Sequence, residues 1–433
     1  MSDEFSLNPG QQKAADDFSA FLFSDHKEFV ITGGPGTGKT HLMKYLIRKA
    51  TQEYQDTCAI LGVKAEYYDV MLTATTNTAA DVLYGLTTWP TSTIHNFMNL
   101  KVVGNVETGK TSLAETKSWK IHSNHILFID EASLVDPDLY RLVHEGTHKS
   151  KIIWVGDKDQ LMSPTAGVSP VFTRNLPMVE LTQPMRNSTQ PALMNIVEQL
   201  RDTVRTGTFK PIQAIKGVID WVDDQGLEQA LKTYHSQQSY DHRIMAYTNN
   251  RVVAFNDHIR DMRGYTGTYQ LGELLVAANS VSRSSQKISV EKKFLVVDIG
   301  KSEEVDLGND IIFQIQHLTL KDQNGAYYRD VKVPADPEHY RSMVSWLKNQ
   351  KKWAIYFTLQ ETYLELRPHD AATVYKGQGN SHDVVIIDLS NIATCHNPDQ
   401  AARMLYVAFS RARNRVIMYG DLPSKYGSVL AAE

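Results

Sequence analysis

A glycine-rich segment near the N-terminus has the spacing G-x-x-x-x-G-K-[ST] and reads Gly33-Gly34-Pro35-Gly36-Thr37-Gly38-Lys39-Thr40. Glycines let the backbone curl so that its N–H groups face an anion, and the positive end of the following helix attracts the same anion. Lys39 is expected to reach the β- and γ-phosphates, and the Thr40 hydroxyl is expected to ligate Mg²⁺. The segment therefore predicts a nucleoside triphosphate site, with binding residues Gly34, Pro35, Gly36, Thr37, Gly38, Lys39 and Thr40.

Two acidic residues, Asp130 and Glu131, follow the apolar run 126–129. Alone, this pattern is equally typical of a surface strand end. Beside a phosphate loop it indicates hydrolysis, because such a loop requires an acid at the end of a neighbouring buried strand. We expect Asp130 to hold Mg²⁺ and Glu131 to orient and deprotonate the attacking water.

The elements that position these residues follow a regular alternation. Nearly continuous apolar runs predict buried parallel strands at 28–32, 70–74, 126–130 and 151–156, with helices at 41–50 and 78–86 between them. A second alternation begins near residue 186, with strands at 242–248, 382–389 and 415–419. The fold class is α/β, with parallel sheets joined by right-handed crossovers.

Two stretches interrupt this rhythm. Residues 100–122 contain glycines at 104 and 109 and predict a small hairpin inserted in the first α/β domain. Residues 271–366 predict a β module inserted in the second, with strands near 287–298, 311–320 and 326–333, turns at Gly300, Gly308 and Asn324-Gly325, and a helix at 337–347.

The composition limits the classes of protein to which this chain can belong. A chain of 433 residues is too long to fold around one ordinary hydrophobic core. Its content of 42% hydrophobic and 22% charged residues is typical of a globular protein. We expect no secretory signal, no membrane segment and a cytoplasmic location (the host cytoplasm for a phage protein). Cys58 and Cys395 stand far apart, which excludes a disulfide scaffold. The net charge of -4 argues against a uniformly basic surface and leaves a local nucleic-acid groove open.

The ordered motifs resemble those of superfamily 1 helicases, in the 5′-to-3′ (1B) branch of Dda-like and RecD-like enzymes. The resemblance implies two RecA-like P-loop domains. Domain 1A would span 1–185 with a hairpin insertion, 1B, at about 100–122; domain 2A would comprise 186–270 and 367–433; and 271–366 would form an SH3-like domain, 2B.

The resemblance also implies further nucleotide contacts. In the segment Leu7–Ala14, Gln11 would read adenine, with Gln12 as the alternative, and Gln160 in 155–161 would sense the γ-phosphate. Gly379 would approach the nucleotide with its backbone. Arg186 in 181–186 and Arg411 in 405–413 would contact the γ-phosphate across the cleft between the domains, Arg411 as the arginine finger.

Six residues correspond to the family's single-strand contacts: Thr76, Thr93, His95, Phe97, Thr373 and Lys376. Hydroxyl and backbone groups would hold phosphates and rings would stack on bases. Without the resemblance, the segments around Thr76 and Thr93 read as helix caps. This chain has Thr75 where the family often has proline, and Tyr375 where histidine is common.

In the family the first insertion is a pin that splits the duplex. Trp119, Val102 and Val103 are the apolar candidates for that contact, and a passive surface hairpin is the alternative. In the second insertion, the basic stretch 348–353 ends on Trp353 and is typical of a single-strand contact. Trp346, Trp353, Tyr356 and Phe357 are also consistent with a hydrophobic core.

The resemblance implies an ATP-dependent DNA helicase that uses ATP and Mg²⁺, moves 5′ to 3′ on single-stranded DNA and separates partial duplex DNA. We expect a monomer with no membrane partner, and a single-strand-binding protein or replisome component as protein partner. The alternatives are a RecD-like recombination helicase, an RNA helicase of the same superfamily, a P-loop switch or assembly ATPase, and a non-catalytic single-strand-binding module.

Overall fold

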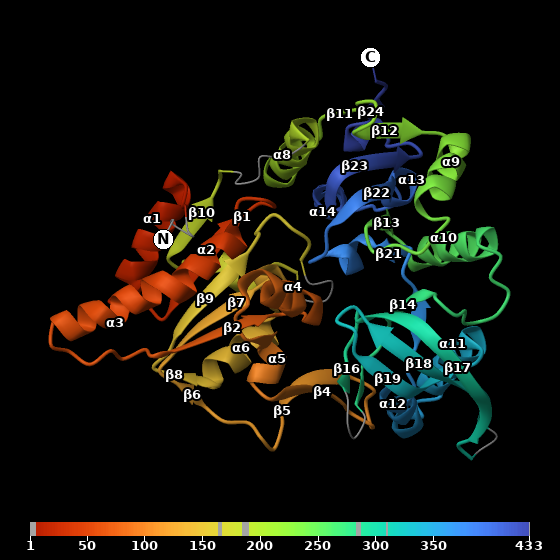
Figure 1. The fold of residues 1–433 in the computed structure, drawn as a ribbon, viewed down its shortest axis with the longest axis horizontal. Coiled ribbons are helices and arrows are strands. Elements are labelled where there is room, and N and C mark those ends of the chain that lie inside the picture. The colour runs from red at the N-terminus through yellow and green to blue at the C-terminus, as the bar shows by residue number, and fades with distance from the viewer. Residues whose placement is uncertain (1–5, 163–166, 184–189, 283–286, 309–310, 433) are drawn as a thin grey trace. The chain divides into compact units, whose positions relative to one another are not determined.

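The computed structural model describes residues 6–162, 167–183, 190–282, 287–308 and 311–432 (Figure 1). The chain divides into two compact units. Unit 1 comprises Met1–Lys101 and Leu113–Thr189, and unit 2 comprises Val102–Ser112 and Gln190–Glu433. No helix in the described part of the chain is long and apolar enough to cross a bilayer.

Unit 1 contains a six-stranded sheet in the order β10-β1-β9-β7-β2-β3, and every pairing in it is parallel. The strands are β1 (Glu28–Gly33), β2 (Asp69–Ala74), β3 (Thr91–Thr93), β7 (His125–Asp130), β9 (Lys151–Gly156) and β10 (Met178–Leu181). The four strands predicted for the first domain are confirmed. Each is buried on both faces, which produces the continuous apolar runs in the sequence.

The helices of unit 1 cover both faces of this sheet. Along β7, Ile126 and Phe128 pack into one hydrophobic core, whereas Leu127 and Ile129 pack into the other. The first core takes helices α1 (Pro9–Leu22), α2 (Lys39–Tyr45), α3 (Thr51–Ile60) and α4 (Asn77–Thr87). The second takes α5 (Ile94–Phe97), α6 (Pro137–Glu145) and α7 (Pro170–Thr173). The single helix predicted at 41–50 is instead α2 followed by a π-helical turn, Leu46–Ala50, which leads directly into α3.

Unit 2 contains a parallel five-stranded sheet in the order β12-β23-β22-β13-β21. Its strands are β12 (Ile219–Val222), β13 (His242–Ala246), β21 (Ala371–Thr373), β22 (His382–Asp388) and β23 (Ala412–Tyr419). Its helices are α8 (Pro191–Thr206), α9 (Asp224–Tyr234), α10 (Asn249–Met262), α13 (Leu389–Ile392) and α14 (Pro398–Ser410). The strands predicted at 242–248, 382–389 and 415–419 are confirmed.

A second, five-stranded sheet of unit 2 has the order β19-β18-β17-β14-β20 and antiparallel pairing. It comprises β14 (Leu274–Ala277), β17 (Lys293–Asp306), β18 (Ile312–Asp322), β19 (Tyr327–Pro334) and β20 (Leu366–Pro368). Helices α11 (Pro337–Asn349) and α12 (Trp353–Thr362) lie between β19 and β20 in the chain. The predicted helix corresponds to α11, whereas α12 was not anticipated.

The turn predicted at Gly300 is wrong. Strand β17 continues through this residue, and its register with β18 shifts between Ile299 and Ser302. An added Cβ at Gly300 would lie 3.3 Å from the carbonyl oxygen of His317, so glycine fits a β-bulge here. The turn predicted at Asn324-Gly325 is present, with Gly325 at φ +85° and its N–H donating to the Asp322 carbonyl.

Within the described residues, the remaining strands form four pairs. β4 (Leu100–Gly104) and β5 (Thr111–Glu115) make the predicted hairpin. The other pairs are β6 (His122–Ser123) with β8 (Thr147–His148), β11 (Ile212–Gln213) with β24 (Val429–Leu430), and β15 (Val281–Ser282) with β16 (Lys287–Ile288). Short 3-10 helices occur at Ala132–Leu134, Val374–Gly377 and Ser424–Tyr426.

Candidate active site and nucleic-acid interface

The phosphate loop connects the end of β1 at Gly33 to the start of α2 at Lys39. Gly36 and Gly38 have φ values of +76° and +82°, a region in which side chains are strained. An added Cβ at Gly33 would lie 2.7 Å from the Thr37 hydroxyl and 2.8 Å from the Leu181 carbonyl oxygen. Glycine avoids the clash at position 33 and the strain at positions 36 and 38, so the residue types match a loop that wraps an anion.

The Lys39 ammonium lies over this loop. Its Nζ donates to the carbonyls of Gly33 at 2.6 Å and Gly34 at 3.0 Å, and the Thr37 hydroxyl also donates to the Gly34 carbonyl at 2.8 Å. A phosphate is a stronger acceptor for an ammonium group than a neutral carbonyl is. The lysine is therefore held at the loop and can exchange these carbonyls for phosphate oxygens.

Gln11 lies against the phosphate loop from helix α1. Its side chain is fully buried, its Nε2 donates to the Gly38 carbonyl at 3.3 Å, and its Oε1 accepts from the Asn8 N–H at 3.1 Å. Gln12 is exposed, and its Nε2 donates to the Asp16 carboxylate on the same helix. Of the two glutamines, Gln11 is the one that contacts the loop.

Asp130 and Glu131 lie at the carboxyl end of β7, which the sheet places between β2 and β9. Desolvation, and next to it the charge of Glu131, raise the pKa of the Asp130 carboxyl to about 7. A divalent cation would favour the ionised carboxylate, so the residues fit a metal bound here. Among the described residues, no three His, Cys, Asp or Glu side chains gather as a protein-only metal site. Mg²⁺ commonly needs only one or two carboxylates, completed by phosphate oxygens and water.

Glu131 has a left-handed backbone, with φ +56° and ψ +46°. This conformation costs a non-glycine residue about 1–3 kcal/mol and persists only where the surroundings impose it. Gly156, at the end of β9, contributes to those surroundings. An added Cβ there would lie 3.0 Å from the Ala132 nitrogen, so glycine lets β9 approach the segment that follows Glu131.

Thr75 connects the loop after β2 to both acidic residues. Its N–H donates to the Asp130 carbonyl at 3.2 Å, and its hydroxyl donates to the Glu131 carbonyl, also at 3.2 Å. Proline, the residue common in the family at this position, has neither donor. Thr75 therefore makes two hydrogen bonds that proline at this position could not make.

Gln160 lies in the loop that follows β9. Its side chain is buried and its N–H donates to the Asp157 carbonyl at 3.3 Å. The neighbouring Lys158 pairs with Glu180 at 2.7 Å, and the Lys158 N–H donates to the Thr32 hydroxyl on β1 at 3.3 Å. These bonds fix the loop to the strand that carries the phosphate loop.

Two of the four single-strand candidates of unit 1, Thr76 and Thr93, are helix caps. The Thr76 hydroxyl accepts from the Ala79 N–H at 3.2 Å and caps α4, and the Thr93 hydroxyl accepts from the Asn96 N–H at 3.1 Å and caps α5. The Phe97 ring stacks on His122 at 4.1 Å between centroids. His95, on α5, is half-buried. Capping explains why both positions are threonine, and a DNA role for them remains a prediction.

Unit 2 carries the other predicted residues. Arg411 caps the carboxyl end of α14 and is buried, and its guanidinium donates to the Ser410 hydroxyl at 2.9 Å and the Asn380 carbonyl at 3.4 Å. Gly379 has φ +77°. The Thr373 hydroxyl accepts from the Lys376 N–H at 3.4 Å and starts the 3-10 turn Val374–Gly377. Arg186 lies outside the described residues.

Tyr375 connects this turn to α14. The Gln400 side chain on α14 donates to the Tyr375 hydroxyl at 2.7 Å, so the residue that replaces the family's histidine has a structural partner. Arg413 and Arg415 form ion pairs, with Asp383 at 2.9 Å and Asp220 at 2.7 Å respectively.

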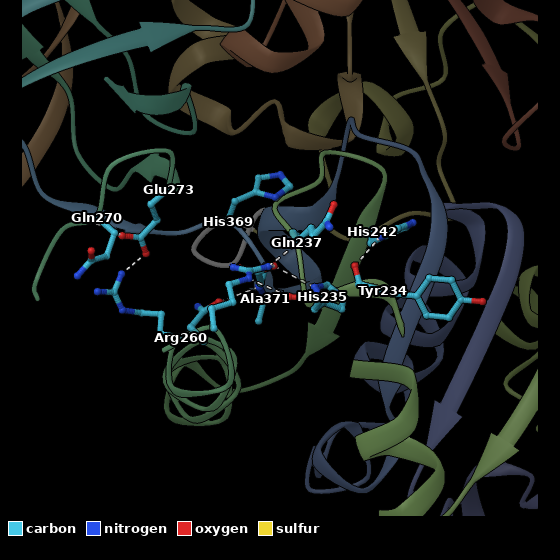
Figure 2. A network of polar contacts seen from close by, with 12 residues as sticks. Tyr234, His235, Gln237, His242, Arg260, Gln270, Glu273, His369 and Ala371 are labelled. Atoms are coloured by element: carbon cyan, nitrogen blue, oxygen red, sulfur yellow. Dashed lines mark hydrogen bonds and ion pairs between the residues drawn. The ribbon is translucent and has the colours of Figure 1, made fainter. Parts of the chain in front are cut away.

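Strand β21, which leads to Thr373, rests on a buried polar network (Figure 2). Asp370 accepts from the Arg263 guanidinium at 2.7 Å and contacts His235 Nδ1 at 2.9 Å. Desolvation by itself would raise the pKa of Asp370, but the bonds from His235 and Arg263 outweigh it and lower the pKa to about 2. Figure 2 also shows Arg260 reaching from α10 to Glu273, just before β14. No local pattern in the sequence predicts this network, because its members are far apart along the chain.

The hairpin tip packs on α12 within unit 2. An added Cβ at Gly104 would lie 2.1 Å from the Phe357 ring, and one at Gly109 would lie 2.2 Å from the Trp353 ring. Trp353 and Phe357 thus brace the hairpin, a role for which the sequence gives no local signal. Trp119 is not part of the hairpin tip: its ring lies against Gly146 and Met98 of unit 1. Val102 is exposed and Val103 is half-buried.

Residues 6–224 match the family model of an AAA domain, and residues 369–419 match that of a UvrD-like helicase C-terminal domain. The chain belongs to the AAA-domain family, as a superfamily 1B helicase of the Dda type. The helicase assignment confirms the family predicted from the motifs and makes the chain an ATP hydrolase.

Relatives of this helicase cover nearly its whole length. The ATP-dependent DNA helicase dda of Enterobacteria phage T4 is 24% identical over 94% of this chain and 98% of its own. A structure of the Bacteroides Pif1 helicase with ADP-AlF3 and ssDNA has a TM-score of 0.52 at 17% identity, covering 98% of this chain and 94% of its own. A Pif1 structure concerned with unwinding of forked dsDNA has a TM-score of 0.54 at 16% identity, with the same coverage. These structures support the predicted fold of two RecA-like domains.

Proposed function

We propose that this ATP-dependent DNA helicase translocates 5′ to 3′ on single-stranded DNA and separates partial duplexes. The observation that carries the proposal is the pair of hydrogen bonds from Thr75, because they join a predicted DNA-contacting loop to the predicted hydrolytic acids. DNA as substrate rests on the similarity to dda, described as a DNA helicase, and to a Pif1 complex that contains ssDNA. The direction of movement rests on the resemblance to the 5′-to-3′ branch.

For hydrolysis, the loop residues Gly34 to Gly38 bind the phosphates and Lys39 neutralises their charge. Thr40 and Asp130 hold Mg²⁺, which when bound polarises the phosphate and offsets its charge. Glu131 orients the attacking water and takes its proton. Gln160 senses the γ-phosphate, and Arg186 and Arg411 stabilise charge on the transferring phosphoryl group.

Base recognition and DNA binding use separate groups. Gln11 exchanges its bond to the Gly38 carbonyl for the adenine edge, and Gly379 approaches the nucleotide with its backbone. The DNA contacts are Thr76, Thr93, His95, Phe97, Thr373 and Lys376. The hairpin of about 100–122 acts as the pin, and we retain domain 1A at 1–185, domain 2A at 186–270 and 367–433, and domain 2B at 271–366.

Unwinding of partial duplexes tests the proposal. Substrates with a 5′ or a 3′ overhang, each built from DNA or RNA strands, are mixed with the protein and Mg·ATP. Strand separation is expected only with a 5′ DNA overhang. Separation from a 3′ overhang would overturn the polarity, and equal activity on RNA overhangs would overturn the substrate. Sedimentation of the protein bound to DNA tests whether it is a monomer. A binding assay with a single-strand-binding protein tests whether that protein is a partner.

A further inference from the structure

The hairpin tip and the turn between α11 and α12 form one lysine-rich surface on unit 2. We call Lys110, Lys348, Lys351 and Lys352 the lysine surface. Lys110 belongs to the hairpin, and the other three belong to the end of α11 and the turn that follows it. Lys352 is half-buried and the other three are exposed.

Tight packing brings the two segments together. The Cβ position of Gly109, the residue before Lys110, lies 2.2 Å from the Trp353 ring, and Trp353 directly follows Lys352. Gly104, at the other side of the tip, approaches Phe357 just as closely, one turn further along α12. Both ends of the tip contact α12, so the position of the hairpin on this helix is fixed. Lys110 therefore lies near the lysines of the turn.

The charge of this surface is unbalanced. Residues 102–112 and 345–357 together contain four lysines and a single carboxylate, Glu107. Among the described residues, none of the four lysines takes part in an ion pair. Lysines that stabilise a fold at the surface are commonly paired along a helix, whereas unpaired lysines in a cluster repel each other. Such a cluster is suited to an external polyanion.

An exposed aromatic ring adjoins Lys352 of the lysine surface. Trp346 on α11 is 44% exposed, and the Lys352 Nζ lies 4.6 Å from the centre of its ring. Aromatic side chains stack on unpaired bases, and adjacent cations hold the phosphates that connect them. Paired bases in a duplex expose no face for such stacking. The combination therefore favours a single strand over a double helix.

We propose that the lysine surface is a second DNA site, separate from the motor, which binds the strand displaced from the duplex. The proposal rests on the proposed function in one respect, since the pin role of the hairpin places this surface where the strands part. Binding of its phosphates would keep the displaced strand from pairing again behind the pin. The other strand, along which the protein moves, is bound by the DNA-contacting residues proposed above.

Binding to forked DNA without ATP tests this site. Three substrates share the duplex and the loading overhang, while the displaced strand carries a normal tail, a neutral methylphosphonate tail or no tail. Wild-type protein should bind the normal tail most tightly. With three phosphates neutralised, the gain over the tailless fork should fall by about 18-fold between 50 and 200 mM salt, because each single-strand contact contributes about 0.7 to the slope of log affinity against log salt.

The test variant is Lys348→Gln, Lys351→Gln, Lys352→Gln, and the matched control is Lys13→Gln, Lys64→Gln, Lys216→Gln, which removes the same charge from exposed positions elsewhere. The test variant should bind all three forks alike and keep its single-strand-stimulated ATPase, whereas the control should behave as wild type. Three results would overturn the site: wild-type indifference to the tail, tail dependence that survives in the test variant, or weakening that is equal on the tailless fork. The binding assay needs no ATP, so a protein that fails to unwind would contradict the proposed function and still report on this site.

Discussion

The Thr75 hydroxyl donates a hydrogen bond to the Glu131 carbonyl at 3.2 Å, across two neighbouring strands of the unit 1 sheet. Glu131 is held there in a left-handed conformation that its residue type disfavours. The next residue after Thr75 caps α4, so Thr75 connects the start of that helix to the backbone of the proposed catalytic residue Glu131. We therefore predict that Thr75 couples the proposed DNA contact at Thr76 to the proposed hydrolytic acids.

Substitution of Thr75 tests this coupling. Thr75→Val keeps the shape and removes the hydroxyl, at a cost of about 1 kcal/mol for one hydrogen bond. We expect single-strand-stimulated kcat to fall about 5-fold, with KM for ATP unchanged and the unstimulated rate nearly unchanged. Steady-state ATPase with and without DNA measures this. Thr75→Ser retains the donor and serves as control; an equal loss in both variants would contradict a role for the hydroxyl.

Thr75→Pro removes both donors and introduces the residue common in the family. It should uncouple the rates at least as far as Thr75→Val does, because the bond to the Asp130 carbonyl is lost as well. A proline variant with full DNA stimulation would show that the coupling runs through other contacts. The ratio of stimulated to unstimulated kcat is the quantity to compare.

Loss of the proposed general base should separate nucleotide binding from turnover. Glu131→Gln keeps the size of the side chain and removes its basicity, so kcat should fall by about 10²–10⁴ while ATP affinity stays near that of wild type. Arg411→Ala should likewise abolish turnover and leave ATP binding near normal. Nucleotide titration by fluorescence, beside the ATPase assay, measures both. A variant of either residue with normal kcat would sink that assignment.

The seat of the hairpin on α12 can be tested through Gly109. A Gly109→Ala side chain would meet the Trp353 ring at 2.2 Å and displace the tip. Duplex separation should fall strongly, while DNA-stimulated ATPase is retained. Gly62→Ala is the matched control, since Gly62 has nearly the same φ, +68° against +69°, with nothing near its Cβ position.

Adding Trp353→Ala to Gly109→Ala should restore part of the unwinding, because the smaller side chain removes the clash. Trp353→Ala alone is expected to lose activity through the missing brace. A double-mutant cycle in unwinding rate then gives the coupling between the two residues. Additive losses would mean that the hairpin does not act through its contact with α12.

Stability should depend on pH through buried histidines of unit 2. Burial lowers the pKa of His235, lowers that of His369 well below its usual value, and lowers that of His382 to about 3. Below pH 6.5 the unfolded chain takes up protons at His369 and His382, whereas the folded chain does not. Each residue should therefore reduce the free energy of unfolding by about 1.4 kcal/mol per pH unit. Asp130, whose pKa is raised to about 7, acts in the opposite direction.

His369→Phe isolates the contribution of one histidine to the pH dependence of stability. The ring is buried, with neither nitrogen hydrogen-bonded, so phenylalanine should be tolerated at pH 7.5. Urea unfolding at pH 7.5 and 5.5 should show a smaller loss of stability on acidification in the variant than in wild type. The contribution of Asp130 is the same in both and cancels. An equal loss in the two proteins would contradict the assignment.

The sequence by itself determined the phosphate loop, the acidic pair and the main strands. These follow from local spacing: a glycine pattern sets one loop, and burial on both faces makes a parallel strand apolar along its whole length. The order of the motifs was sufficient to predict the helicase family. The sequence predicts a turn at Gly300, whereas this glycine lies at a β-bulge in β17.

The tertiary structure alone decided which residues meet. Thr75 reaches Glu131, 56 positions away, because β2 and β7 are neighbours in the sheet, and no local pattern states the order of parallel strands. Gly109 meets Trp353 because a hairpin of one segment packs on a helix encoded much later. Asp370 is ionised among buried groups from three separate segments. Spacing along the chain describes each element, whereas contacts between elements depend on how the sheets and their insertions fold together.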